Sequence, residues 1–316
     1  MAIVDGPYFE DLRAGMRFDA PAVTLTEGLA AAHRAIVGCR LPLALDHGLS
    51  RRVTGGVLAA PNLVWDVAIG QSTVVTHTVV ANLFYRGVVF RRAPMIGDTL
   101  TTVTEVAGLR QNSRRPGRAP TGLAALRIST ADQEGRPVLD FWRCAMLPLR
   151  DSGLDTGHAD DLSAIGTAPT RDELAAVTAA WDLDAHPGAG RPEAGEVFEV
   201  AGGDVVTSAP ELARLTLNVA RVHHDAGAGE RLVYGGHTIG IALHQAVRAL
   251  PSLVTVVGWH GCDHLGPVRE NDTLTSTVEV ERLEPLPSGT LAHLRSRVRA
   301  NRAADVLDWR FAAVLA

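Results

Sequence analysis

Hydrophobic and polar residues alternate in two long regions of the chain, and a stretch with a helical pattern precedes each region. The alternation in the first region predicts four strands (79–90, 98–107, 122–130 and 138–149). The second region predicts four more (254–260, 272–283, 291–298 and 306–315). Ahead of the second set, apolar residues recur on one helix face (Ile239, Ala242, Leu243, Ala246, Val247 and Leu250). The pattern therefore predicts a long helix packed against the second set of strands.

Other helices are predicted by capping patterns. Thr24 stands three residues before Glu27, and Ser208 stands three residues before Glu211, the spacing of a capping box. Each predicts the start of a short helix. A further helical stretch at 58–69 precedes the first set of strands. The two halves thus show the same order of elements.

The halves also share sequence. Residues 97–106 (GDTLTTVTEV) match residues 271–280 (NDTLTSTVEV) almost position for position. A repeat of about half the chain predicts one fold used twice. A long buried helix with four long strands suits a curved antiparallel sheet wrapped around that helix. The fold class is therefore predicted as α+β, a tandem (double) hotdog in which the two sheets pair and hide their edges.

The middle of the chain separates the halves. It is rich in Gly, Pro, Asp and Ala, which predicts a connector, and one helix over 170–181 with a Thr170–Glu173 capping box. We expect an N-terminal hotdog at 1–150, a connector at 151–195 and a C-terminal hotdog at 196–316.

Composition narrows the possible partners. Of the 316 residues 46% are hydrophobic and 21% are charged, with a net charge of −5, which argues against a nucleic acid or an anionic membrane as partner. The 30 basic residues are all Arg, so an anion site must use Arg, His or a backbone N–H. We find no secretory signal and no apolar run long enough for a membrane span, and expect a cytoplasmic protein.

Metal and disulfide chemistry are not expected. The three cysteines (Cys39, Cys144 and Cys262) are odd in number, widely spaced and without a CxxC pair. The neighbouring side chains of His223, His224 and Asp225 would point in different directions, which disfavours a metal site.

Several segments resemble MaoC-like hydratases, and among them the mesaconyl-CoA hydratase (β-methylmalyl-CoA dehydratase) group. The resemblance covers both halves but not the connector. It rests on residues 8–15 (YFEDLRAG), 81–85 (ANLFY), 97–100 (GDTL), 105–113 (EVAGLRQNS), 134–140 (EGRPVLD), 218–223 (NVARVH) and 232–237 (LVYGGH). It implies an acyl-CoA hydratase or dehydratase that adds water reversibly to an enoyl-CoA thioester with a short, branched or dicarboxylic acyl group of the mesaconyl-CoA type. Coenzyme A is then part of the substrate, no separate cofactor is expected, and the chemistry lies in the C-terminal half.

The resemblance also implies an Asp and, five residues later, a His that hold water and exchange a proton with the substrate. In this chain those positions are Asn218 and His223, with Asp225 two residues further on. An amide orients water but cannot take its proton. His223 is therefore expected to be the main acid/base, since its ordinary pKa lies near neutrality.

The start of the predicted long helix is the second part of the implied site. A glycine there, Gly235 with Gly236 as the alternate, is expected to offer its N–H to the thioester oxygen, because first-turn N–H groups have no partner within the helix. His237 is expected to be a second base or an orienting group. Tyr234 is expected to contact the substrate.

Further substrate contacts are expected from the loop itself. Arg221 and Arg231 are candidates for binding a substrate carboxylate, and Asp225 for contacting the substrate. In the N-terminal half Cys39 and Ala44 occupy the positions of the Asp and His, so we expect that half to be catalytically empty and to shape the acyl pocket.

Three alternatives remain open at this point. One is an (R)-specific hydratase for medium or long enoyl-CoA thioesters. Another is a non-catalytic acyl-CoA-binding protein, which Asn218 favours. The third is a thioesterase using Asp225 or Glu230. The acyl group, stereochemistry, direction and oligomeric state stay open, with a homodimer as one possibility.

Overall fold

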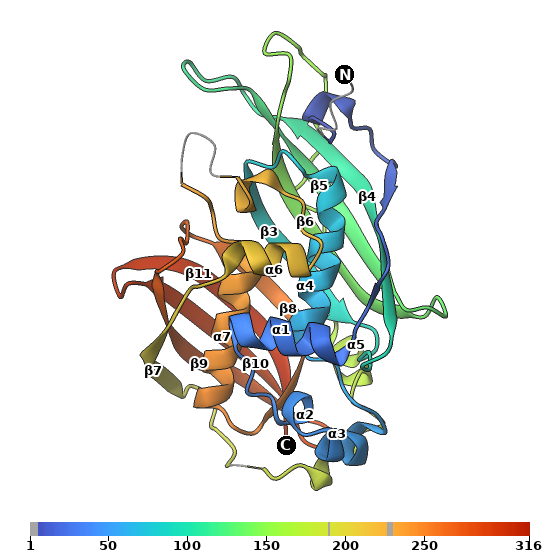
Figure 1. Ribbon diagram of the computed structural model, residues 1–316, viewed down its shortest axis with the longest axis vertical. Coiled ribbons are helices and arrows are strands. Elements are labelled where there is room, and N and C mark those ends of the chain that lie inside the picture. The colour runs from blue at the N-terminus through green and yellow to red at the C-terminus, as the bar shows by residue number, and fades with distance from the viewer. Residues whose placement is uncertain (1–5, 189, 226–229) are drawn as a thin grey trace.

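The computed structural model describes residues 6–188, 190–225 and 230–316, and in them the strands form one antiparallel sheet (Figure 1). Its order is β1-β4-β5-β6-β3-β8-β11-β10-β9-β7, with β2 paired to β4. The strands of the first half are β1 (Arg17–Asp19), β2 (Val23–Thr24), β3 (Ala81–Phe90), β4 (Thr99–Gln111), β5 (Thr121–Ala131) and β6 (Pro137–Pro148). Those of the second are β7 (Val197–Val205), β8 (Leu253–His264), β9 (Thr273–Pro285), β10 (Thr290–Ala300) and β11 (Ala304–Leu315).

In the described residues, seven α-helices and four 3₁₀ turns accompany the sheet. The α-helices are α1 (Glu27–Val37), α2 (Pro42–Leu45), α3 (His47–Thr54), α4 (Pro61–Gln71), α5 (Arg171–Ala176), α6 (Ala209–Leu215) and α7 (Gly235–Ala249). Single 3₁₀ turns are η1 (Phe9–Asp11), η2 (Ser72–Val75), η3 (Leu183–Ala185) and η4 (Arg221–His223). Among the described residues, none of these helices combines the length and apolar character needed to cross a bilayer.

The sheet divides into two matching parts, each wrapped around one helix. The first part packs on α4 and the second on α7, and α4 and α7 contact each other. The parts meet where β3 pairs with β8, in the register Tyr85 to Cys262 and Val89 to Gly258. The predicted double hotdog is confirmed.

Apolar packing across this junction forms the centre of the core. All residues of α4 are buried. Trp65 of α4 packs edge-on against Trp259 of β8 and Trp309 of β11, with ring centroids 5.0 and 5.9 Å apart. Three large buried rings give the two halves a shared apolar contact of several kcal/mol. The two halves therefore share one hydrophobic core at this junction.

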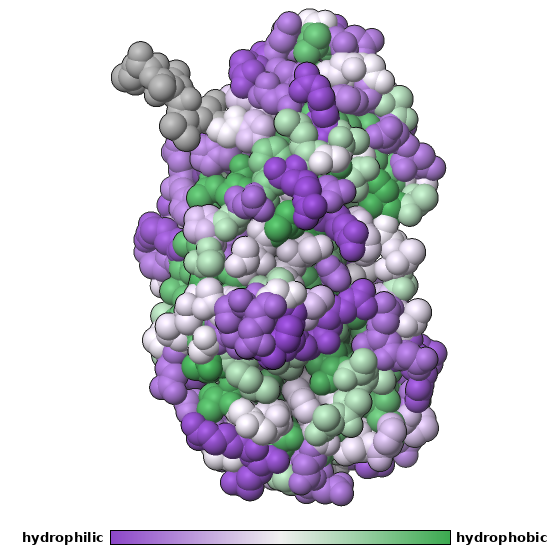
Figure 2. Space-filling view, turned by 90° about the vertical axis from the view of Figure 1, so that its right-hand side faces the viewer, coloured by the Kyte–Doolittle hydropathy of each residue, from purple (hydrophilic) through white to green (hydrophobic). Residues whose placement is uncertain are grey.

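The segment between β6 and β7 crosses the outer face of the junction. Its helix α5 contacts both β3 and β8. Leu174 packs on Gly258, which faces away from Trp259 because successive strand residues alternate in direction. On the same outer face, Arg91, the residue after β3, forms an ion pair with Glu173 of α5, with Nη1 and Oε1 2.7 Å apart. On the face shown in Figure 2, hydrophilic and hydrophobic residues are intermixed.

The sequence predictions of helix ends succeed in part. The Thr170–Glu173 capping box is present, although α5 ends at Ala176, well before the predicted end. The capping box at Thr24 is wrong: Thr26 caps α1 by accepting a hydrogen bond from the Leu29 N–H. Thr24 instead lies in β2, paired with β4.

The predicted capping box at Ser208 is also wrong. Ser208 has a φ of 59° and its side chain makes no cap hydrogen bond. A carboxylate from outside the helix replaces it, since Glu270 accepts from the N–H of Ala209 at 3.1 Å. The edge strands β1 and β7 are not predicted either, because β7 contains two adjacent glycines (Gly202 and Gly203) and β1 is only three residues long.

Close contact between α4 and the loop after α6 leads to a prediction about Gly70. A Cβ at Gly70 would lie 1.8 Å from the carbonyl oxygen of Thr216 and 3.2 Å from the N of Asn218. Gly70→Ala should lower the free energy of unfolding by about 1–3 kcal/mol or more, as overpacking does. The control Gly28→Ala lies on the exposed side of α1, with no atom within 3.4 Å, and should stabilise by about 0.5–1 kcal/mol. Chemical denaturation of both variants tests this, and equal stabilities would contradict it.

Candidate active site

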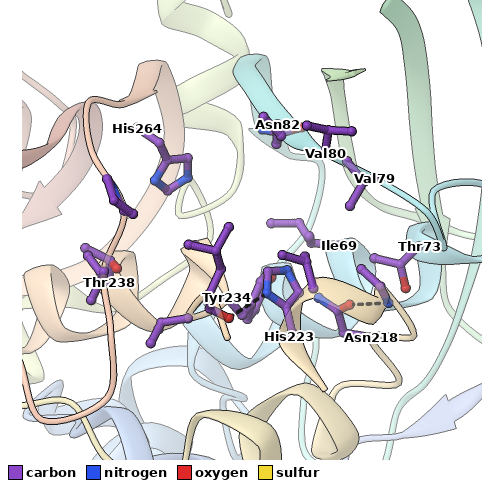
Figure 3. A pocket seen from close by; sticks show the side chains of 18 of the residues that line it. Ile69, Thr73, Val79, Val80, Asn82, Asn218, His223, Tyr234, Thr238 and His264 are labelled. Atoms are coloured by element: carbon purple, nitrogen blue, oxygen red, sulfur yellow. Dashed lines mark hydrogen bonds between the residues drawn. The ribbon is translucent and has the colours of Figure 1, made fainter. Parts of the chain in front are cut away.

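A cavity of about 270 Å³ opens between the two halves, beside the start of α7. Its lining includes four of the nine residues that the sequence singled out (Asn218, His223, Tyr234 and Gly235), together with several that it did not (Figure 3). The second half contributes Asn218, Ala220, Val222, His223, Leu232, Val233, Tyr234, Gly235, Thr238 and 264–268. The first half contributes Ile69, Thr73, 79–82, Tyr85 and Arg143.

His223 ends the short turn η4 and stands on the cavity wall. Its Nδ1 lies 3.0 Å from the carbonyl oxygen of Leu232. A carbonyl only accepts, so Nδ1 carries the proton and Nε2 holds a free lone pair. Burial lowers the pKa of His223 to about 4, with His224 and Arg143 adding to the effect. The ring is therefore a neutral base at neutral pH.

Asn218 lies close to His223 in Figure 3, in the loop that follows α6. Its Oδ1 accepts from the N–H of Ala220 at 3.0 Å, and its own N–H donates to the carbonyl of Ala213 at 2.8 Å. The preceding residue, Leu217, has a φ of 59°, which is costly for a side chain of this kind. Because Oδ1 is occupied, the Asn218 amide presents its NH₂ group as a donor.

The first turn of α7 begins at the cavity. The N–H groups of Gly235 and Gly236 donate to no atom in the part of the chain that the structure describes. Such groups, together with the helix dipole, favour developing negative charge. A Cβ at Gly235 would lie 2.6 Å from the ring of His264, so only glycine permits this approach.

Tyr234, just before α7, is held by a buried chain of polar groups from the first half. Its hydroxyl donates to Asp66 Oδ1 at 3.1 Å, and Asp66 Oδ2 lies 2.8 Å from His33 Nε2. Asp66 is fully buried, and burial raises its pKa. A Cβ at Gly236 would lie 2.1 Å from Asp66 Oδ1, so Gly236 makes room for this carboxylate. The Tyr234 ring in turn packs edge-on against His223, with centroids 5.7 Å apart.

The strands add two site residues that the sequence reasoning missed. His264 ends β8 and faces the cavity, where burial lowers its pKa to about 4. The sequence favours a surface or packing role for His264, and its place in the cavity lining contradicts that expectation. Arg143 of β6 also lines the cavity and is 3% exposed. The alternation of β6 marks Arg143 as inward-facing, which is an unusual position for a charge and was the available signal.

His237 and Gly236 lie outside the cavity lining. His237 is fully buried behind the first turn of α7, and its N–H donates to the carbonyl of Tyr234 at 2.9 Å. Two residues along a helix turn a side chain by about 200°, which carries His237 away from Gly235. This placement argues against the expected role of His237 as a second base and favours Gly235 over Gly236 as the donor.

The charged residues expected to bind substrate lie elsewhere as well. Arg221 and Asp225 border a neighbouring surface pocket, where Arg221 Nη2 lies 3.9 Å from Asp225 Oδ2. Arg231 forms an ion pair with Glu270, which also accepts from the start of α6. The cavity lining contains none of these three residues, so the expectation that they contact the substrate has no geometric support.

The matching place in the first half is a smaller cavity of about 160 Å³. Cys39 and Ala44 both line it, at the positions expected from the repeat. Burial raises the pKa of Cys39, which leaves an inert thiol. Among the described residues no three His, Cys, Asp or Glu side chains are grouped as a metal site would need.

Comparison with curated proteins finds two similar enzymes. The chain is 28% identical to a β-methylmalyl-CoA dehydratase of Chloroflexus aurantiacus over 97% of this chain and 91% of that protein. It is 30% identical to a mesaconyl-CoA hydratase of Cereibacter sphaeroides over 87% of this chain and 83% of that protein. No protein-family model matches the chain.

Solved structures agree with the fold. A conserved hypothetical protein of Mycobacterium tuberculosis with a double hotdog fold is 52% identical, with a TM-score of 0.91 over 99% of both chains. A MaoC domain protein of Chloroflexus aurantiacus has a TM-score of 0.88 at 23% identity, over 100% of this chain and 99% of that one.

The buried chain from His33 to Tyr234 leads to a prediction about Asp66. Asp66→Asn should lower the free energy of unfolding by about 2–4 kcal/mol, because it breaks a buried, charge-assisted contact. Adding Tyr234→Phe should cost less than the sum of the two single changes, since both remove the same hydrogen bond. The control Asp172→Asn, on the surface of α5, should change stability by less than about 0.5 kcal/mol. Denaturant titration measures all four variants, and additive losses would count against the chain.

Proposed function

The chain belongs to the MaoC-like dehydratase family, and on that premise we propose that it catalyses the reversible addition of water to the double bond of an enoyl-CoA thioester. One observation carries the proposal. A neutral imidazole with a free Nε2, on His223, shares one cavity with the unpartnered N–H of Gly235 at the start of a helix. A base for water and a donor for an enolate oxygen are the two groups that this reaction requires.

In this reaction one residue, His223, acts first as the base and then as the acid. His223 Nε2 takes a proton from water while the water oxygen bonds to Cβ. The double-bond electrons move to the thioester oxygen, which accepts from the Gly235 N–H. The protonated His223 then delivers the proton to Cα, which restores the thioester and the neutral ring. Dehydration is the reverse sequence.

Asn218 supports this sequence as a donor. Its NH₂ group is free because its Oδ1 is bonded to the Ala220 N–H. It would hold the water oxygen, or the product hydroxyl, with a lone pair turned toward Cβ. It takes no proton, so the whole transfer falls to His223.

The residues that line the cavity also argue against two alternative functions, a thioesterase and a hydratase for long acyl chains. A thioesterase would need a carboxylate or a positioned water at the thioester. The described lining contains no Asp or Glu, so neither Asp225 nor Glu230 supplies that carboxylate. A hydratase for long apolar chains would favour a lining without a cation, whereas Arg143 lies in this one. We propose that the first half, residues 1–150, is non-catalytic and supplies the acyl side of the cavity, with the connector at 151–195 and the catalytic half at 196–316.

Turnover tests the role of His223. With crotonyl-CoA, we expect loss of the absorbance of the conjugated thioester, and His223→Ala should lower kcat by about 10³-fold because the acid/base is removed. His47→Ala is the matched control: it is a partly exposed histidine of α3, and its rate should stay within twofold of the parent. A folded His223→Ala protein with parental activity would exclude the mechanism.

The dependence on pH tests the protonation state. The base must be neutral, and burial lowers the pKa of His223 to about 4. The kcat/KM for hydration should therefore be flat from about pH 5.5 to 8 and fall as pH drops through about 4. Initial rates, with circular dichroism to confirm folding at each pH, measure this. An acid limb near the ordinary histidine pKa of about 6.5 would show that the ring is not the buried base described here.

A further inference from the structure

Arg143 is a buried cation with part of its guanidinium unused. Its side chain extends from β6 toward η2, where Nη2 donates to the Thr76 hydroxyl at 2.6 Å and to the Ser72 carbonyl at 3.1 Å. Its Nε is buried without an acceptor. Its Nη1 donates to no protein atom within the described part of the chain. The contacts with Ser72 and Thr76 hold the guanidinium in place and leave Nε and Nη1 without an acceptor among the described residues.

This cation also lacks a counter-ion. No carboxylate among the described residues pairs with Arg143, whereas most other arginines of the sheet have one, as Arg295 has Asp308. A guanidinium stays protonated in proteins, so the charge persists despite burial. Burying an unpaired charge is costly, so an anionic ligand that pairs with this guanidinium would recover part of that cost. The side that lacks a partner belongs to the same cavity as His223 and Gly235.

Tyr85 supplies a second donor beside it. Tyr85 of β3 is the cross-strand neighbour of Arg143, and both line the cavity. Its hydroxyl makes no hydrogen bond to any described residue. Burial raises the pKa of Tyr85, so the hydroxyl keeps its proton and can donate it. A guanidinium next to a hydroxyl is a suitable receptor for a carboxylate.

We infer that Arg143 and Tyr85, on the wall that the first half supplies, are the residues that bind the free carboxylate of a dicarboxylic acyl group and so determine the preference for the substrate class that the resemblance implies. This inference rests on the proposed function for the position of the thioester. With the thioester oxygen at Gly235, on the second half, the far end of a short acyl group points to the wall that the first half supplies. Arg143 then fulfils the role that the sequence suggested for Arg221 or Arg231.

Binding of unreactive thioesters tests the carboxylate site without turnover. Succinyl-CoA and butyryl-CoA differ by a carboxylate in place of a methyl group and have no double bond to hydrate. By titration calorimetry, the wild-type protein should bind succinyl-CoA at least tenfold more tightly. Arg143→Gln, which can still donate to Thr76, should abolish that preference, and Arg143→Lys should restore part of it. The control Arg127→Leu removes an exposed arginine from the next strand, β5, and should keep the full preference. Equal affinities in the wild-type protein would overturn the inference.

Turnover separates this inference from the proposed function. Fumaryl-CoA and crotonyl-CoA also differ by a carboxylate in place of a methyl group, and each has a double bond that can be hydrated. The wild-type kcat/KM should favour fumaryl-CoA by about 10²-fold, and in Arg143→Gln the ratio of the two kcat/KM values should fall to about one. An equal loss for both would overturn the inference, because Arg143 would then act on the thioester. If succinyl-CoA binds preferentially yet neither enoyl thioester reacts, the hydratase proposal fails and the carboxylate site stands.

Discussion

The antiparallel pairing of β3 with β8 is the contact on which the rest of this structure depends. It joins two half-sheets into one and sets α4 against α7, with Trp65, Trp259 and Trp309 packed across the junction. Because the halves are fused, the cavity beside this junction has two different walls. A symmetric pair would have two equal sites. In this chain Cys39 and Ala44 line the smaller cavity of the first half, while Arg143 and Tyr85 of the same half line the larger one.

Burial across the junction determines the chemical state of the site. Desolvation keeps the ring of His223 neutral, while the Leu232 carbonyl fixes which nitrogen carries the proton. The same low-dielectric setting makes the Asp66 contact with Tyr234 strong and the unpaired charge of Arg143 costly. Burial between the halves thus keeps His223 neutral and makes the unpaired charge of Arg143 costly.

Local patterns predicted the parts of this molecule that local forces determine. The apolar stripe from Ile239 to Leu250 predicted α7, and the repeat predicted the double hotdog. The family resemblance predicted that Asn218, His223 and Gly235 belong to one site, and all three line the same cavity. Contacts between segments that lie far apart in the sequence could not be predicted from local patterns. The cap of α6 comes from Glu270, and His264 and Arg143 reach the cavity only through strand pairing that no single segment encodes.

The central claim is that one cavity places a thioester between the helix N-terminus and His223. A crystal structure with bound (R)- or (S)-3-hydroxybutyryl-CoA tests it most directly. The account predicts the thioester oxygen within hydrogen-bond distance of the Gly235 N–H, and the product hydroxyl within reach of both His223 Nε2 and the Asn218 amide. A thioester bound in another pocket, or a hydroxyl turned away from His223, would contradict it.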